Sequence, residues 1–290
     1  MADATPTLLR RRLGTILKTM RMRAGLNLAD AAKLLDLYGA PSLSKIENGK
    51  HRPPDLDKFF AVYGVEDADR IAETQEIAKL ANSSRQYALY TQYRDVIRSP
   101  FADFMELEEI ATRTDAYGAL VIPGLLQTVD YAHAVIEGSS VWKTMREVRA
   151  FAELRMKRQG ILVHNAESDR PPLTLRCVLD EACLRREVGG RGVLRGQLEH
   201  LLTVSMQPNI ELQVLPFAAG AHTGINGAYT VFNFHVGEPV VAVEPLAKSI
   251  YLEEDAHVVR YAIAFEHLQA QALDPEMSRD FIRRIAKETQ

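Results

Sequence analysis

Hydrophobic residues recur at spacings of three and four over the first sixty positions, which predicts a series of short amphipathic helices. The first apolar face lies in TLLRRRLGTILKTM, and Gly25 is expected to end that helix. Asn27 is well placed to cap a second helix. A third helix turns Leu43 and Ile46 inward and leaves small polar and basic side chains outward. Two short helices joined by a tight turn, the second of them with an exposed polar face, predict a helix-turn-helix.

The pattern changes after residue 65. Residues 66–99 read as a helical connector that carries a stripe of tyrosines, Tyr87, Tyr90 and Tyr93, which indicates packing rather than cofactor binding. Beyond it we expect a short apolar strand at 118–122, a turn at Pro123, and a helix capped by Thr128.

Further helices and strands follow, with a strand entering a helix that Asp180 caps, a hairpin turning at 237–238, and two C-terminal helices. This order predicts a mixed α+β domain. The expected fold is therefore multidomain: an all-α helix-turn-helix domain at 1–65, a helical connector at 66–99, and an α+β domain at 100–290.

Charge separates the two ends of the chain. Residues 1–60 contain 11 Lys/Arg and 6 Asp/Glu, a net of +5, and the totals of 35 and 38 leave 24 and 32 for the remainder, a net of −8. A basic segment on an acidic remainder indicates a polyanionic partner at one end only, although uneven surface charge without function is the alternative.

Two cysteines are too few for a disulfide scaffold and indicate buried, reduced thiols. No apolar run reaches the roughly 18 residues of a membrane span, and the N-terminus lacks the pattern of a signal peptide. We therefore expect a cytoplasmic protein with no membrane partner.

The N-terminal motifs resemble a known family. The run from Leu13 to Val65, with GLN after the first helix and SKIENGKHRP at the third, resembles the phage-repressor-like (Xre-type) helix-turn-helix domain. The resemblance implies five helices, a double-stranded DNA operator as partner, and a buried structural ion pair between Arg21 and Glu47. It also implies phosphate contacts by Asn27, Asn48, Lys50 and Arg52, and a base-facing set of Ala40, Pro41, Ser42, Ser44 and Lys45.

The chain departs from that family in its recognition region. Gly39 stands where Ser or Thr is usual, Pro41 lies in the first turn of the recognition helix, and Leu28 replaces a common Gln. We therefore expect direct base readout to rest on few side chains, with DNA shape supplying the rest. A helical protein-binding module with a solvated basic loop is the alternative.

The second half resembles the C-terminal domain, of unknown function, of actinobacterial antitoxin-like regulators. The resemblance rests on IPGLLQTVDYA, RMKRQGIL, LDEACLRREVGG, QLEHLL and NIELQVLPFAAGAH, in that order. It implies gene regulation, frequently beside a small partner protein encoded nearby. The paired tryptophans expected near the end of the connector are absent, and tyrosines stand there instead.

We expect no catalysis, no metal and no cofactor. The candidate residues have no metal-ligand spacing, and the chain contains no nucleophile elbow, P-loop or dinucleotide fingerprint. These candidates are His164, His222, His235, His257, Cys177, Cys183, Asp180 and Glu181.

The sequence therefore predicts a homodimeric transcriptional regulator whose C-terminal domain dimerises and receives a signal. The signal comes from a small protein or from an unidentified small-molecule effector. Two alternatives remain: an antitoxin-like protein that mainly neutralises a small protein partner, and a small-molecule-responsive receptor.

Overall fold

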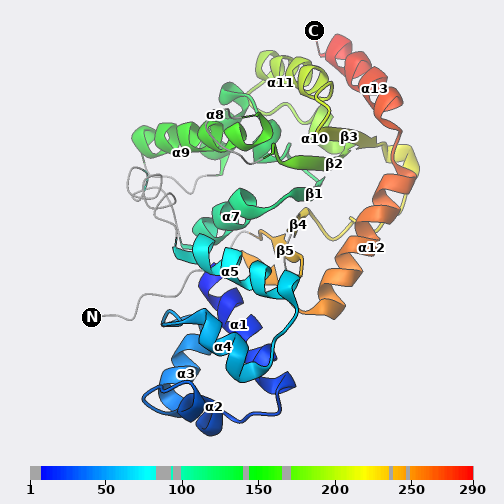
Figure 1. Cartoon of the computed structure of the whole chain (residues 1–290). Coiled ribbons are helices and arrows are strands. Elements are labelled where there is room, and N and C mark those ends of the chain that lie inside the picture. The colour runs from blue at the N-terminus through cyan, green and yellow to red at the C-terminus, as the bar shows by residue number, and fades with distance from the viewer. Residues whose placement is uncertain are drawn as a thin grey trace. The chain divides into compact units, whose positions relative to one another are not determined.

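The computed structural model describes residues 8–82, 93, 99–139, 144–164, 171–234, 238–245 and 249–289. The chain divides into two compact units, Met1–Leu89 and Tyr90–Gln290 (Figure 1). Of the predicted tyrosine stripe, Tyr87 and Tyr90 lie outside the described residues, whereas Tyr93 is helical and buried. Among the described helices, none combines the length and the hydropathy that crossing a membrane requires.

Helices alone form the described part of the N-terminal unit. They are α1 (Leu8–Arg23), α2 (Leu28–Leu34), α3 (Ala40–Glu47), α4 (Leu56–Tyr63) and α5 (Ala68–Asn82). The first helix is central, because α3, α4 and α5 all pack on it. The predicted boundary at residue 65 would separate α5 from α1, whereas the structure places both in one unit. The predicted helix-turn-helix, α2 and α3, is confirmed.

Local side chains fix the ends of these helices. Asn27 caps α2 as predicted, since its Oδ1 accepts the N–H groups of Ala29 and Asp30, both at 2.9 Å. Asp55 caps α4 in the same way, and Gly64 ends that helix in the left-handed conformation.

A six-stranded sheet is the framework of the C-terminal unit, in the order β3-β2-β1-β4-β5-β6. The strands β1 to β3 are mutually parallel, and β4 to β6 pair antiparallel to their neighbours. Their bounds are β1 (Arg113–Gly118), β2 (Thr174–Asp180), β3 (Ile210–Leu215), β4 (Tyr229–Asn233), β5 (Val240–Val243) and β6 (Ile250–Leu252). The mixed sheet confirms the predicted α+β class.

Seven helices accompany the sheet in the described residues. They are α7 (Ser99–Ile110), α8 (Val129–Gly138), α9 (Met145–Arg158), α10 (Glu181–Arg185), α11 (Arg191–Val204), α12 (Asp255–Gln271) and α13 (Pro275–Glu288). Short 3-10 turns occur at Gly124–Leu126 (η1), Gln159–Leu162 (η2) and Phe217–Ala219 (η3). The predicted caps are confirmed: Thr128 accepts the N–H of Tyr131, and Asp180 accepts that of Ala182.

The two faces of the sheet carry different cores. One face of the sheet is covered by α12 (Figure 1). This helix buries Val258, Phe265 and Leu268 in a cluster that includes Tyr117 and Tyr229 of the strands. On the other face α7 contributes Phe104, whose ring packs edge-on against Phe232 of β4 at a centroid distance of 5.1 Å. The second face is the one that holds the pocket described below.

One predicted strand was wrong. We expected it at 118–122, but β1 ends at Gly118, and residues 119–122 form no strand. The true strand includes the buried Asp115, whose carboxylate pairs with Arg113 and Arg176 at 3.2 and 2.6 Å. A buried charge that is paired across the sheet breaks the apolar pattern from which strands are predicted. The hairpin of β4 and β5 is confirmed, although residue 237 of its turn lies outside the described residues.

Candidate nucleic-acid interface and a pocket in the C-terminal unit

A buried ion pair joins the recognition helix α3 to α1. Arg21 donates from Nε and Nη2 to the two carboxylate oxygens of Glu47, at 2.6 and 3.0 Å. Its Nη1 donates to the carbonyl of Leu26 at 2.7 Å, so the pair also holds the segment that leads into α2. Both side chains are at most 9% exposed, and the hydrogen bond to Glu47 raises the pKa of Arg21. The pair therefore fixes α3 relative to both preceding helices.

Two glycines let α3 approach α1 closely. A Cβ at Gly14 would lie 2.4 Å from the carbonyl oxygen of Glu47, and one at Gly49 would lie 2.6 Å from the backbone nitrogen of Arg11. Gly49 also has a φ of +71° and ends α3 in the left-handed conformation. The glycine of the IENG run thus stops the helix where the chain must pass the backbone of α1.

The base-facing set lies along the first two turns of α3. Pro41 and Lys45 are exposed, whereas Ala40, Ser42 and Ser44 are partly buried. Lys50 and Arg52 are exposed in the loop that follows. Since Leu43 and Ile46 are buried in the core, the outward surface of α3 consists of small side chains and a single long cation. Lys45 is the one member with both the length and the charge to reach guanine acceptors.

The two asparagines are engaged within the domain. The side-chain oxygen of Asn27 accepts the capping hydrogen bonds of α2, and its Nδ2 donates to Asp30 at 2.7 Å. The amide of Asn48 donates to the carbonyl of Ser44 at 2.7 Å. Asp30 also places a carboxylate in the first turn of α2, which would repel a phosphate. Phosphate binding at the N-terminus of α2 therefore has less support than phosphate binding by the loop that contains Lys50.

Tyr38 was not among the residues that the sequence indicated for the DNA-facing surface. Its side chain is 101% exposed in the turn directly before α3, next to Gly39, whose φ is +86°. An aromatic residue in full contact with water beside a recognition helix is unusual, because burial would stabilise it. The available signal was its position in the turn between the two motif helices.

In the C-terminal unit, glutamine side chains hold the PGLLQT motif in place. Gln127 donates to the carbonyl of Ile122 at 2.6 Å, and Gln159 donates to the carbonyls of Gly124 and Gln127. From the other side, Gln197 accepts the N–H of Thr128 and donates to a motif carbonyl, at 2.6 and 2.7 Å. These amides satisfy the backbone of an irregular loop that is largely buried.

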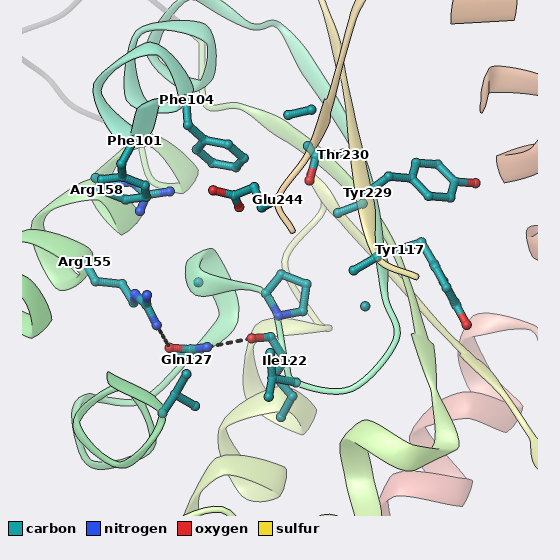
Figure 2. Close-up of a pocket in the computed structure, with 18 residues that line it drawn as sticks. Phe101, Phe104, Tyr117, Ile122, Gln127, Arg155, Arg158, Tyr229, Thr230 and Glu244 are labelled. Carbon is teal, nitrogen blue, oxygen red and sulfur yellow. Dashed lines mark hydrogen bonds between the residues drawn. The ribbon is translucent and has the colours of Figure 1, made fainter. Parts of the chain in front are cut away.

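Beside this loop a cavity of about 220 Å³ lies between the second face of the sheet and the helices α7, α8 and α9. Figure 2 shows that polar side chains border the cavity together with aromatic rings. The polar side chains come from α9, from Gln127 directly after η1, and from Glu244 directly after β5. The principal lining side chains are Phe101, Phe104, Ile122, Gln127, Arg155, Arg158, Thr230 and Glu244.

The two arginines of α9 have different surroundings. Arg158 donates from Nε and Nη2 to the buried carboxylate of Glu108, at 2.7 and 2.8 Å, and lies over the ring of Phe101. Arg155 donates from Nη1 to Gln127 at 2.7 Å, while its buried Nε has no hydrogen-bond partner in the part of the chain that the structure describes. Burial and repulsion by Arg158 lower the pKa of Arg155 to about 10.

Of the described residues considered for catalysis, only Asp180 and His222 form an arrangement of an imidazole with a carboxylate. His222 Nε2 lies 3.8 Å from Asp180 Oδ2, and the hydroxyl of Tyr117 donates to the same oxygen at 3.3 Å. Burial raises the pKa of the Cys183 thiol to about 12, which keeps it protonated. Within the described residues, no three His, Cys, Asp or Glu side chains are grouped to hold a metal, and His235 lies outside those residues.

The geometry defines a helix-turn-helix protein with an attached α+β domain, and comparison with protein families agrees. A helix-turn-helix domain model matches residues 12–73. The chain belongs to the family of the domain of unknown function DUF5753, whose model matches residues 101–284. No significant match was found among curated proteins or among solved structures.

Proposed function

We propose that this protein is a sequence-specific transcriptional regulator of the Xre type, which acts in the cytoplasm and binds its operator as a homodimer. One observation carries the proposal: an exposed, basic end of α3 is held rigidly to α1 by the Arg21–Glu47 pair, in a segment that matches a helix-turn-helix model. A recognition helix must keep its orientation to read base edges, and the buried pair supplies that rigidity.

The proposal assigns a non-enzymatic role to the C-terminal domain, which dimerises and receives a signal. The motif resemblance to actinobacterial antitoxin-like regulators supports this assignment, as does the net charge of −8 outside residues 1–60, which disfavours contact with DNA. Among the alternatives, the cavity at α9 favours a small-molecule-responsive receptor. Neutralisation of a small protein partner stays a prediction.

The test begins by selecting bound fragments from random double-stranded DNA with the full-length protein. Binding of the selected sequence and of an unrelated duplex is then compared for Lys45→Ala, Lys50→Ala and a control, Lys79→Ala, whose side chain is 78% exposed on α5 outside the motif. We expect Lys45→Ala to reduce the preference for the selected sequence, because Lys45 faces the bases. Lys50→Ala should weaken binding of both duplexes to a similar degree, because a phosphate contact carries no sequence information. Selection that enriches no sequence would refute the proposal.

A further inference from the structure

The cavity at α9 exists because one row of the sheet carries small side chains. Ala116, Thr230 and Ala242 are register partners across β1, β4 and β5, so they project from the same face. In the next row Phe232 fills the corresponding space by packing against Phe104. The small row therefore leaves about 220 Å³ between the strands and the helices that cover them.

Two opposite charges border this cavity without forming an ion pair. Arg21 and Arg158 both place Nε and Nη2 on a glutamate carboxylate, at distances of 2.6 to 3.0 Å. Among the described residues Arg155 has no such carboxylate, and its one hydrogen bond there goes to the neutral amide of Gln127. Glu244 forms no hydrogen bond or ion pair with any described residue, and both side chains border the cavity in Figure 2.

This arrangement is costly for an empty cavity. The guanidinium of Arg155 is partly removed from bulk water, and its buried Nε has no hydrogen-bond partner among the described residues, whereas Glu244 is exposed at the edge of the cavity. The pKa of Arg155 reflects this, because burial and repulsion by Arg158 lower it. A ligand carboxylate would give Arg155 a charged partner, and an ammonium on the same ligand would pair with Glu244 at the exposed edge of the cavity.

We propose that the cavity binds a small amino-acid-like ligand, whose carboxylate faces Arg155, whose ammonium faces Glu244, and whose apolar body packs on Phe101 and Phe104. The two arginines and the carboxylates of Glu108 and Glu244 have a net charge of zero. A zwitterion keeps that net charge, whereas a simple anion or cation would change it. The volume is below the roughly 300–1,000 Å³ of pockets for drug-sized molecules, which restricts the ligand to a small one. The ligand's role as signal rests on the proposed function, whereas its binding does not.

Titration calorimetry on the full-length protein without DNA tests the ligand class. Three matched probes are used: L-phenylalanine, 3-phenylpropionate, which lacks the ammonium, and phenethylamine, which lacks the carboxylate. We expect L-phenylalanine to bind most tightly, and loss of either charged group to weaken binding roughly tenfold or more. Equal binding of phenethylamine and L-phenylalanine would overturn the proposal, as would the absence of saturable binding by all three at millimolar concentrations.

Variants then assign the contacts. Arg155→Met should abolish the preference for L-phenylalanine over phenethylamine, and Glu244→Gln should abolish the preference over 3-phenylpropionate. Ala242→Val narrows the cavity while it leaves the charged groups in place, and should weaken all three probes. Arg149→Met is the matched control, because Arg149 is exposed on the same helix and does not line the cavity. Wild-type preferences in either charge variant would overturn the assignment.

Two outcomes need separation. If Arg155→Met unfolds because Gln127 loses its partner, as thermal melts would show, the Glu244→Gln and Ala242→Val results decide the matter. DNA binding is measured on the same proteins by fluorescence anisotropy. Ligand binding without selective DNA binding refutes only the proposed function, and selective DNA binding without ligand binding refutes only the ligand site.

Discussion

Replacing one partner of the Arg21–Glu47 pair should destabilise the N-terminal unit severely. In Arg21→Met the carboxylate of Glu47 loses both of its guanidinium hydrogen bonds while it stays in the core, where its side chain is 4% exposed. The carbonyl of Leu26 also loses its donor. A buried charge without its partner costs about 3–5 kcal/mol. Small domains have about 5–15 kcal/mol of stability in total, so this loss would leave a substantial unfolded fraction.

The double variant Arg21→Met/Glu47→Leu separates the cost of an unpaired charge from the value of the pair. With both charges removed, no buried charge is left without a partner, and the Leu26 carbonyl is the one group that loses a hydrogen bond of the pair. We therefore expect the double variant to be more stable than Arg21→Met alone. Its folded fraction should still bind DNA, because packed apolar side chains then hold α3 in place of the ion pair, which does not itself face the bases.

Urea denaturation followed by far-ultraviolet circular dichroism measures these differences. Hydrogen exchange of peptides from α1 and α3 assigns the transition to the N-terminal unit. The control is Lys58→Met, which breaks the ion pair between Lys58 and the 82% exposed carboxylate of Asp36 and should cost about 0–1 kcal/mol. If Arg21→Met costs no more than Lys58→Met, the buried pair does not hold the domain together and the reasoning is refuted.

Three further predictions concern the two units. Lys50→Ala and Arg52→Ala should each reduce the slope of log Kobs against log salt concentration by about one unit, as measured by anisotropy on any duplex; an unchanged slope would remove these side chains from the phosphate contacts. Gly14→Ala should lower the melting temperature, because its Cβ would lie 2.4 Å from the Glu47 carbonyl oxygen, whereas Gly196→Ala in α11, with open space around it, should not. Residues 1–89 alone should sediment as a monomer and bind a full operator no better than a half-site, because two copies must be held about 34–36 Å apart for tight binding; a dimeric fragment that binds as tightly as the whole chain would contradict this.

The N-terminal unit was predictable because its signals are local. Helical spacing, a capping asparagine and a helix-ending glycine each act within a few residues, so Asn27 and the order of helices followed from the sequence. The requirement for glycine at position 49 could be predicted from the sequence only in part. Its left-handed conformation could be expected from the end of a helix, whereas its close approach to Arg11 depends on how α1 and α3 pack.

The error at β1 has the opposite origin. Asp115 is stabilised by Arg176, which lies 61 positions away in the sequence and next to it only after β1 and β2 pair. Viewed along the chain, a charged residue argues against a buried strand. In the folded sheet it belongs to a network that also includes Asn233 and Gln269. Patterns of hydrophobicity cannot indicate a polar cluster whose members are brought together by strand pairing.

The pocket depends on register in the same way. Ala116, Thr230 and Ala242 are unremarkable residues in three separate segments, and they form a row only because β4 pairs with both β1 and β5 in one particular alignment. A shift of one residue would turn Tyr229 or Val231 toward the helices and fill the space. The charged side chains that border the cavity reach it from α9 and from the end of β5, so their shared surroundings are likewise a product of topology. Arg155 and Glu244 therefore border one cavity because of a sheet alignment, and the residues adjacent to either of them in the sequence do not specify that alignment.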